Sequence, residues 1–157
     1  MKGNDKIIAL LNESLKAELT AINQYFLHSS MCQNWGYLRL AKKQREESIG
    51  EMKHAEELLE RILFLEGQPN MTDLYPIKIG GTIKQQLDND LALEVHAVGQ
   101  LNGAVKAATA AGDNASRALF EMILKDEEEH VDWLEAQLGM IKEMGLQMYL
   151  SQQMHAG

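Results

Sequence analysis

The feature that most constrains this chain is a set of apolar helical stripes that acidic or imidazole side chains interrupt. In the first stripe, apolar residues recur in steps of three and four from Ile8 to Tyr25, with Glu18 where an apolar residue belongs. Such steps are typical of a helix with one buried face. The interrupting residues are therefore expected to face other helices, and they are Glu18, Glu51, His54, Glu94, Glu127 and His130.

These six residues form the same arrangement twice. Glu18 is followed 33 positions later by the pair Glu51-x-x-His54, and Glu94 is followed 33 positions later by Glu127-x-x-His130. Each member of the second set lies 76 positions after its counterpart. The repeat predicts two similar helix pairs related by a pseudo-two-fold axis.

Four long helices and one short helix account for the rest of the pattern. With 157 residues and two prolines, the chain suits one all-α domain, residues 1–157. Asn4 or Asp5 can cap the first helix, Thr82 the third, and Asp113 or Asn114 the fourth, which ends at Gly145. The other expected ranges are about 5–34 for the first helix, 38–66 for the second, 83–111 for the third and 146–154 for a short fifth helix.

The long irregular segment 67–81 separates the second and third helices. A helix of about 28 residues is roughly 42 Å long, and about 15 extended residues reach roughly 50 Å. The segment can therefore run the length of the bundle and leave these two helices parallel. One long crossover of this kind is the ferritin-like arrangement of a four-helix bundle.

Composition excludes several functions. The net charge of −8 argues against nucleic-acid binding through phosphate contacts. The single cysteine, Cys32, forms neither an internal disulfide nor a cysteine-rich metal motif. No stretch is apolar and long enough to span a membrane, and the first residues have no signal-peptide character. A cytoplasmic protein without a membrane partner is expected.

Four carboxylates and two imidazoles on buried stripes can hold two divalent metal ions. Residues three apart share a helix face, so each Glu-x-x-His pair can aim both side chains at one point. Hard oxygen ligands with imidazole suit iron, manganese or zinc. The alternative is structural polar packing, but burying an unpaired carboxylate costs several kcal/mol. The stripes carry no lysine or arginine at these levels, so a metal is the preferred interpretation.

Other polar residues near the stripes remain open to two readings. Tyr25 is either a core tyrosine or a redox neighbour of the metals, and Glu47 is either a ligand-supporting carboxylate or a solvated position. His28 and His96 have no Glu three residues before them and are expected at the surface or at the edge of the bundle. Trp133 is expected to pack in the core. Met52 lies about 100° around the helix from Glu51, towards the outer face, where a methionine usually fills space.

Several stretches together resemble the bacterioferritins, the haem-containing bacterial members of the ferritin family. They are Glu18 with residues 21–28, residues 51–55, 61–67 and 126–130, and residues 132–135. The resemblance implies that the six residues ligate a di-iron centre, with Glu51 and Glu127 bridging. It also implies that Met52 and its symmetry mate ligate one haem b per subunit pair. Residues near that haem would be Leu19, Ile22, Asn23, Phe26 and Ile49, with Arg45 or Lys53 at its propionates.

The resemblance further implies a function in iron storage and detoxification. Such proteins form 24-subunit shells, oxidise Fe(II) with dioxygen or hydrogen peroxide as ferroxidases, and store ferric mineral. Their haem is thought to assist iron release with electrons from a small ferredoxin. The alternative is a di-iron oxidase or peroxidase of rubrerythrin type that forms no cage, although a single cysteine argues against it. One departure is Gly50, which removes a ligand of the auxiliary inner-surface iron site of some members.

Overall fold

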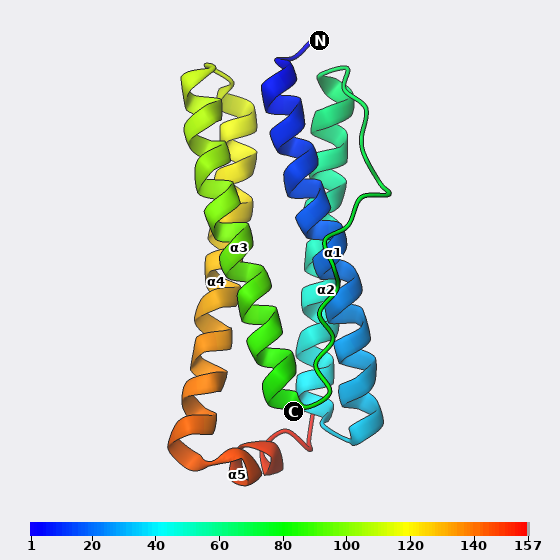
Figure 1. The fold of residues 1–157 in the computed structure, drawn as a ribbon, viewed down its shortest axis with the longest axis vertical. Coiled ribbons are helices and arrows are strands. Elements are labelled where there is room, and N and C mark those ends of the chain that lie inside the picture. The colour runs from blue at the N-terminus through cyan, green and yellow to red at the C-terminus, as the bar shows by residue number, and fades with distance from the viewer. Residues whose placement is uncertain (157) are drawn as a thin grey trace.

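The computed structural model describes residues 1–156, which form helices and connecting segments but no strand. Four long helices lie side by side, and a short fifth helix crosses one end of the bundle (Figure 1). Within these residues no helix is long and apolar enough to cross a bilayer. The expected all-α bundle is confirmed, and its helices are α1 (Asp5–Trp35), α2 (Leu38–Phe64), α3 (Ile83–Ala110), α4 (Asn114–Met144) and α5 (Leu146–Ser151).

Side chains cap three of the long helices at their N-termini. Asn4 accepts hydrogen bonds from the first turn of α1, the shorter at 2.8 Å. Thr82 does the same for α3 at 3.2 Å, and Asp113 for α4 at 3.0 Å. Because each cap satisfies backbone N–H groups that have no helical partner, these residues set where the helices begin. Of the paired candidates in the sequence, Asn4 and Asp113 are the caps.

Helix α2 ends at Phe64, two residues before the expected end. Glu66 adopts a left-handed conformation with φ 63°, and the N–H of Gly67 returns to the carbonyl of Ile62 at 2.9 Å. This pattern satisfies the last carbonyls of a helix. Gly67 is required for a different reason, because a Cβ there would lie 2.7 Å from Cγ2 of Ile8 on α1. Helix α5 is also shorter than expected and ends at Ser151.

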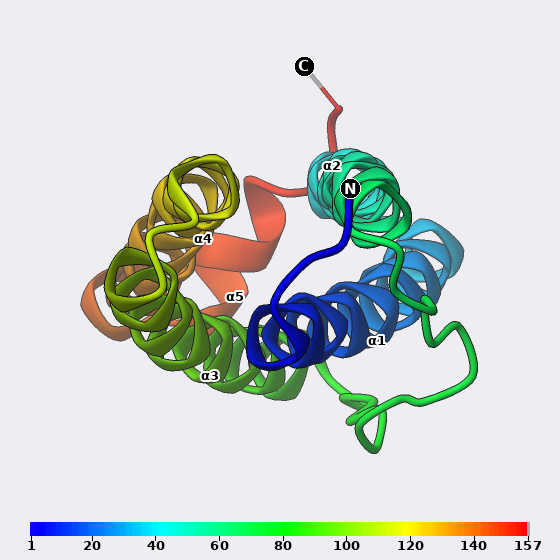
Figure 2. The ribbon, with the colours of Figure 1, turned by 90° about the horizontal axis from the view of Figure 1, so that it is seen from above.

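The crossover between α2 and α3 runs the length of the bundle. It leaves α2 at one end, passes along α1, and enters α3 at the other end (Figure 1). Helices α2 and α3 therefore point in the same direction, as the loop length predicted. Seen along the bundle, the four long helices occupy four corners, and α5 lies beneath them (Figure 2).

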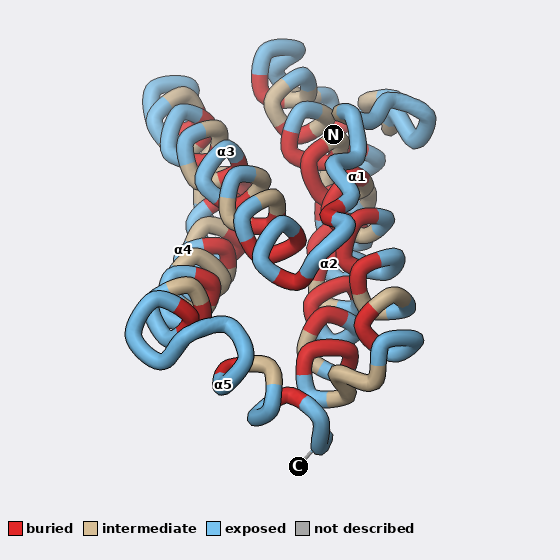
Figure 3. The backbone as a smooth tube through the Cα atoms, turned by 60° about the horizontal axis from the view of Figure 1, so that its bottom comes forward, coloured by how far each residue is buried: buried red, intermediate tan, exposed pale blue. Residues whose placement is uncertain are grey.

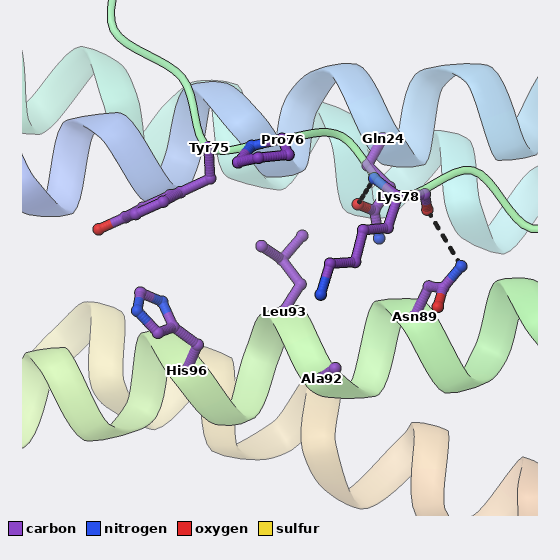
Figure 4. A pocket seen from close by; sticks show the side chains of 8 residues that line it. All are labelled: Gln24, Tyr75, Pro76, Lys78, Asn89, Ala92, Leu93 and His96. Atoms are coloured by element: carbon purple, nitrogen blue, oxygen red, sulfur yellow. Dashed lines mark hydrogen bonds between the residues drawn. The ribbon is translucent and has the colours of Figure 1, made fainter.

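Three side chains on one face of α1 hold the crossover in place. They lie four residues apart, so they share that face, and each accepts a hydrogen bond from a backbone N–H of the crossover. The pairs are Thr20 with Tyr75 at 3.0 Å, Gln24 with Lys78 at 3.2 Å, and His28 with Gly80 at 3.0 Å. Across the crossover, the amide of Asn89 on α3 donates to the carbonyl of Lys78 at 3.3 Å (Figure 4).

His28 does not lie at the surface, which was one of its two expected positions. Its side chain is fully buried and bonds to Asp90 on α3 and to the backbone of Gly80. The reason is that the crossover covers this face of α1, which helical periodicity alone leaves open to solvent. His96 is exposed, as expected.

Two apolar clusters fill the bundle, with buried polar side chains between them. The buried positions recur along all four long helices (Figure 3). The first cluster lies towards the N-terminal end of α1 and includes Leu15, Leu58 and Ile123. The second lies towards α5 and includes Leu40 and Leu87, with Trp133 packed against it. All four long helices pass from one cluster to the other, so each contributes residues to the polar layer between them.

Candidate metal centre

All six residues of the repeated pattern lie together in the polar layer. Glu18 comes from α1, Glu94 from α3, and one Glu-x-x-His pair each from α2 and α4. The four carboxylates are 1–2% exposed, and the side chain of His130, the most accessible of the six, is 16% exposed. Helical periodicity and the crossover therefore bring residues as far apart as positions 18 and 130 into one buried cluster.

The cluster divides into two overlapping groups of four. In each group, one oxygen or nitrogen atom per residue lies within 4.8 Å of the corresponding atoms of the others. Glu51 and Glu127 belong to both groups and lie between them. The first group is Glu18, Glu51, His54 and Glu127, and the second is Glu51, Glu94, Glu127 and His130.

Both imidazoles point Nδ1 into the cluster. Nδ1 of His54 lies 3.3 Å from Oε1 of Glu127 and 3.5 Å from Oε2 of Glu18. Nδ1 of His130 lies 3.2 Å from Oε1 of Glu51 and 3.5 Å from Oε2 of Glu127. Each nitrogen therefore faces two or more carboxylates at distances wide enough for an ion between them.

The outer nitrogen of each imidazole lies against a further carboxylate. Nε2 of His54 lies 2.7 Å from Oδ2 of Asp126, and Nε2 of His130 contacts Oε2 of Glu47. A carboxylate behind an imidazole fixes its orientation and leaves the inner nitrogen free as a ligand. Asp126 does not lie on an apolar stripe, so the stripes do not indicate this role, although one of the stretches that resemble the bacterioferritins includes it. Its side chain is 43% exposed in the structure.

Glu47 is buried, so it is not the solvated helix position that was one of its two interpretations. Lys43, one turn earlier on α2, contacts Glu47 at 2.8 Å, and its ammonium lies 5.1 Å from the ring centre of Trp133. Burial raises the pKa of Glu47, but bonds from His130 and Lys43 outweigh it and hold the pKa below its usual value. Lys43 therefore reaches the edge of the cluster, although it lies one helical turn before Glu47 on α2.

The carboxylates strongly perturb one another in the absence of a cation. Burial, followed by repulsion from Glu51 and Glu127, raises the pKa of Glu18 well above its usual range. Burial and repulsion from Glu127 do the same to the pKa of Glu94. Burial alone would lower the pKa of His54, but its carboxylate neighbours raise it far above its usual value. The four carboxylates therefore repel one another strongly enough that a positive charge between them would be stabilising.

The donor set fits a pair of divalent cations. Six side-chain atoms in the cluster are buried without a hydrogen-bond partner, and every one of them can act as a metal ligand. Among residues 1–156, no lysine or arginine forms an ion pair with the four glutamates of the cluster. Unsatisfied buried acceptors each cost about 1–3 kcal/mol. The unpaired atoms are Glu18 Oε2, Glu51 Oε1, His54 Nδ1, Glu94 Oε2, Glu127 Oε1 and His130 Nδ1.

Tyr25 lies directly against the cluster. Its hydroxyl donates to Oε1 of Glu94 at 2.7 Å, and its side chain is buried. Burial, then the charges of Glu94 and Asp90, raise the pKa of Tyr25 well above its usual value. The hydroxyl is satisfied, as expected of a core tyrosine. A redox role next to the metals stays a prediction.

Met52 lies outside the cluster, although it follows Glu51 in sequence. Glu51 is 1% exposed, whereas Met52 is 55% exposed on the outer face of α2. Ile49 on α2 and Phe26 on α1 are also exposed, and the hydroxyl of Ser48 bonds to the carbonyl of Ile22 at 2.9 Å, which joins α1 to α2. Met52 is therefore a surface residue of α2 and not part of the cluster.

The fold and this centre together define a four-helix-bundle protein of the ferritin-like class. Residues 8–144 match the family described as Ferritin-like domain. Curated relatives named bacterioferritin resemble nearly the whole chain. The protein of Mycolicibacterium paratuberculosis is 45% identical over 152 residues, covering 97% of this chain and 96% of the relative. That of Brucella melitensis is 45% identical over 149 residues, covering 95% and 92%.

A third relative, from Streptomyces coelicolor, is 44% identical over 151 residues and covers 96% of this chain and 90% of its own length. The chain belongs to the bacterioferritin branch of the ferritin-like family. The resemblance seen in the sequence is therefore confirmed.

Proposed function

We propose that this protein stores and detoxifies iron by oxidising Fe(II) at the six-residue centre and retaining the ferric product. The observation that carries the proposal is the set of six buried, unpaired ligand atoms, arranged as two groups that share Glu51 and Glu127. Two adjacent sites with shared carboxylates suit a two-electron reaction on two metal ions. Family membership supports iron over manganese or zinc.

Each residue has a definite role in holding the substrate Fe(II). Glu18 and His54 serve one position and Glu94 and His130 the other, while Glu51 and Glu127 serve both. Asp126 and Glu47 orient the two imidazoles from behind. Protons held by Glu18, Glu94 and the imidazoles in the metal-free protein leave as Fe(II) binds, because ligands must be deprotonated.

The electron balance fits a pair of irons. Two Fe(II) ions give up two electrons. These electrons reduce one hydrogen peroxide, which takes up two protons and gives two waters, or they reduce one dioxygen, which takes up two protons and gives hydrogen peroxide. The chain's own part is to hold both irons in one buried place, exclude bulk water and accept the change in charge. We expect one such ferroxidase domain, residues 1–157, in each subunit.

The proposal extends to the assembly. We expect a homo-oligomer of 24 subunits in the cytoplasm, with one haem b per subunit pair ligated by Met52 of each partner. The exposure of Met52, Ile49 and Phe26 supports this, because exposed large apolar side chains often mark a surface that a partner covers. The haem would carry electrons for iron release, supplied by a small ferredoxin.

Stopped-flow oxidation of Fe(II) by assembled protein tests the centre. Glu127→Gln removes a carboxylate shared by both groups and should abolish the rapid phase at two Fe(II) per subunit, leaving only slow oxidation. Glu128→Gln is the matched control, because the next residue on α4 is exposed and should leave the rapid phase unchanged. An unaltered rapid phase in Glu127→Gln would exclude the assignment. A purified protein of monomer mass would exclude the shell and favour the rubrerythrin-type alternative.

A further inference from the structure

A second polar cluster lies inside the bundle, next to the metal centre on the side of α5. Asp90 on α3, one turn before Glu94, is at its middle and is fully buried. Oδ1 of Asp90 accepts from Gln24 Nε2 at 2.8 Å and from His28 Nδ1 at 3.0 Å. Its Oδ2 accepts from Gln44 Nε2 at 3.3 Å. Three side chains from α1 and α2 thus surround one carboxylate.

The hydrogen bonds fix the protonation of this cluster. The backbone N–H of Gly80 donates to Nε2 of His28 at 3.0 Å, so that nitrogen is an acceptor and the ring proton is on Nδ1. His28 is therefore neutral and donates to Asp90. A Cβ on Gly80 would collide with the backbone of Gln86, so glycine permits this close approach. Since every partner of Asp90 is a donor, its carboxylate is ionised.

This negative charge has no cation beside it. Within the described part of the chain, its only recorded ion-pair contact is with His28, which is neutral. A cavity of about 210 Å³ lies between the crossover and α3, and Gln24 is among its lining residues (Figure 4). Asp90 does not line this cavity and is 0% exposed. Solvent therefore screens the charge poorly.

The charge is close enough to act on the metal centre. Residues four apart on a helix have Cβ atoms about 6 Å apart on the same face, so Asp90 lies one turn from the ligand Glu94. The charge of Asp90 also contributes to the raised pKa of Tyr25, after burial and Glu94. Tyr25 bonds directly to Glu94, so the field of Asp90 reaches the edge of the cluster.

We propose that Asp90 is an electrostatic positioning residue, a fixed buried negative charge that strengthens metal binding at the six-residue centre and favours the more highly charged, oxidised metal. This inference rests on the proposed function. The four ligand carboxylates balance two divalent cations, so Asp90 supplies one negative charge beyond that balance. The gain grows with metal charge, because Coulomb attraction is proportional to it. The neutral donors Gln24, His28 and Gln44 hold the charge without cancelling it.

Titration of metal-free, assembled protein with Co(II), followed by its visible absorption bands, tests the inference without any turnover. Removing a unit charge roughly 10 Å from a divalent ion should weaken its binding by about tenfold or more. Asp90→Asn should show that loss. Asp88→Asn removes an exposed charge from the same helix and should change the affinity by less than about twofold. His28→Gln loses one partner of Asp90 but keeps its charge and should also bind normally.

The outcomes separate charge from structure. Equal Co(II) affinity in Asp90→Asn and the parent overturns the inference, and so does an equal loss in His28→Gln, which would indicate a purely structural role. Asp90→Ser provides a second neutral variant, because its hydroxyl can still accept a hydrogen bond. Failure of both neutral variants to assemble, while His28→Gln assembles, also overturns it. A parent protein that binds no Co(II) would instead overturn the proposed function.

Discussion

Glu94→Gln should stabilise the metal-free protein and weaken metal binding. In the absence of metal, burial and repulsion from Glu127 raise the pKa of Glu94, so its ionised form is unfavourable in the fold. Glutamine has the same shape and no charge, and its carbonyl can still accept from the hydroxyl of Tyr25. The structure therefore predicts opposite effects of one substitution on stability and on ligation.

The magnitude follows from the burial of Glu94, which is 1% exposed. Replacing a buried ion pair by neutral side chains of similar volume often stabilises a protein by about 1–4 kcal/mol, and we take about 2 kcal/mol for this one repelled carboxylate. For a domain of this size, each kcal/mol shifts the melting temperature by about 2–4 °C. The metal-free variant should thus melt about 4–8 °C above the parent at pH 7.5.

The pH dependence has a definite sign. A carboxyl whose folded pKa is raised contributes stability below its ordinary pKa of 4.5, and that stability is lost as pH rises towards the folded value. The advantage of Glu94→Gln should therefore grow from pH 5 to pH 7.5 and be smallest at the acidic end. Glu128→Gln, an exposed change, should show no such dependence.

Zn(II), which has no redox chemistry, completes the assay. At 100 times the dissociation constant, each bound ion adds about 2.7 kcal/mol, so the parent with two sites should gain about 5 kcal/mol. Glu94→Gln keeps only the group around Glu18 and His54 intact and should gain about half as much. Thermal unfolding followed by circular dichroism, with chelator or with Zn(II), measures both quantities. A metal-free variant less stable than the parent at pH 7.5 would refute the reasoning.

Two further predictions concern residues outside the six. Met52→Leu should abolish the low-spin haem spectrum of reconstituted protein, expected at about one haem per two subunits, while leaving the shell intact; retention of the haem would exclude Met52 as its ligand. Asp126→Asn removes the charge behind His54 and should weaken one of two Zn(II) sites by about tenfold, measured by calorimetry. Asp132→Asn, exposed on the same helix, is the control, and two unchanged sites would contradict the role of Asp126.

The helices and the six-residue cluster could be predicted from sequence because both depend on local periodicity. Glu18 and Glu94 occupy positions of the apolar stripes where an apolar residue is expected, and helical periodicity alone predicts that they face the core. The end of α2 was missed because Glu66 adopts the left-handed conformation usual for glycine. Three-residue and four-residue steps carry no signal for such a turn.

The second polar cluster could not be predicted for a different reason. His28 is buried by a crossover that is remote in sequence and irregular in conformation, so no periodicity marks the covered face. Lys43 was missed because its long side chain reaches Glu47 from a turn away. Asp126 was missed as a supporting residue because it is partly exposed and off the stripe. His28 and Asp126 have their partners on other segments, whereas Lys43 reaches its partner within α2 through a long side chain.

The sharing of Glu51 and Glu127 has a consequence for how the two halves of the chain stay together. Helices α1 and α2 form one hairpin and α3 and α4 another, and along the chain the crossover is what connects them. Each group of four ligands takes three residues from one hairpin and one from the other: Glu127 completes the first group, and Glu51 completes the second. Neither hairpin can hold a metal fully by itself, so each bound ion would cross-link the two and report that they have paired correctly.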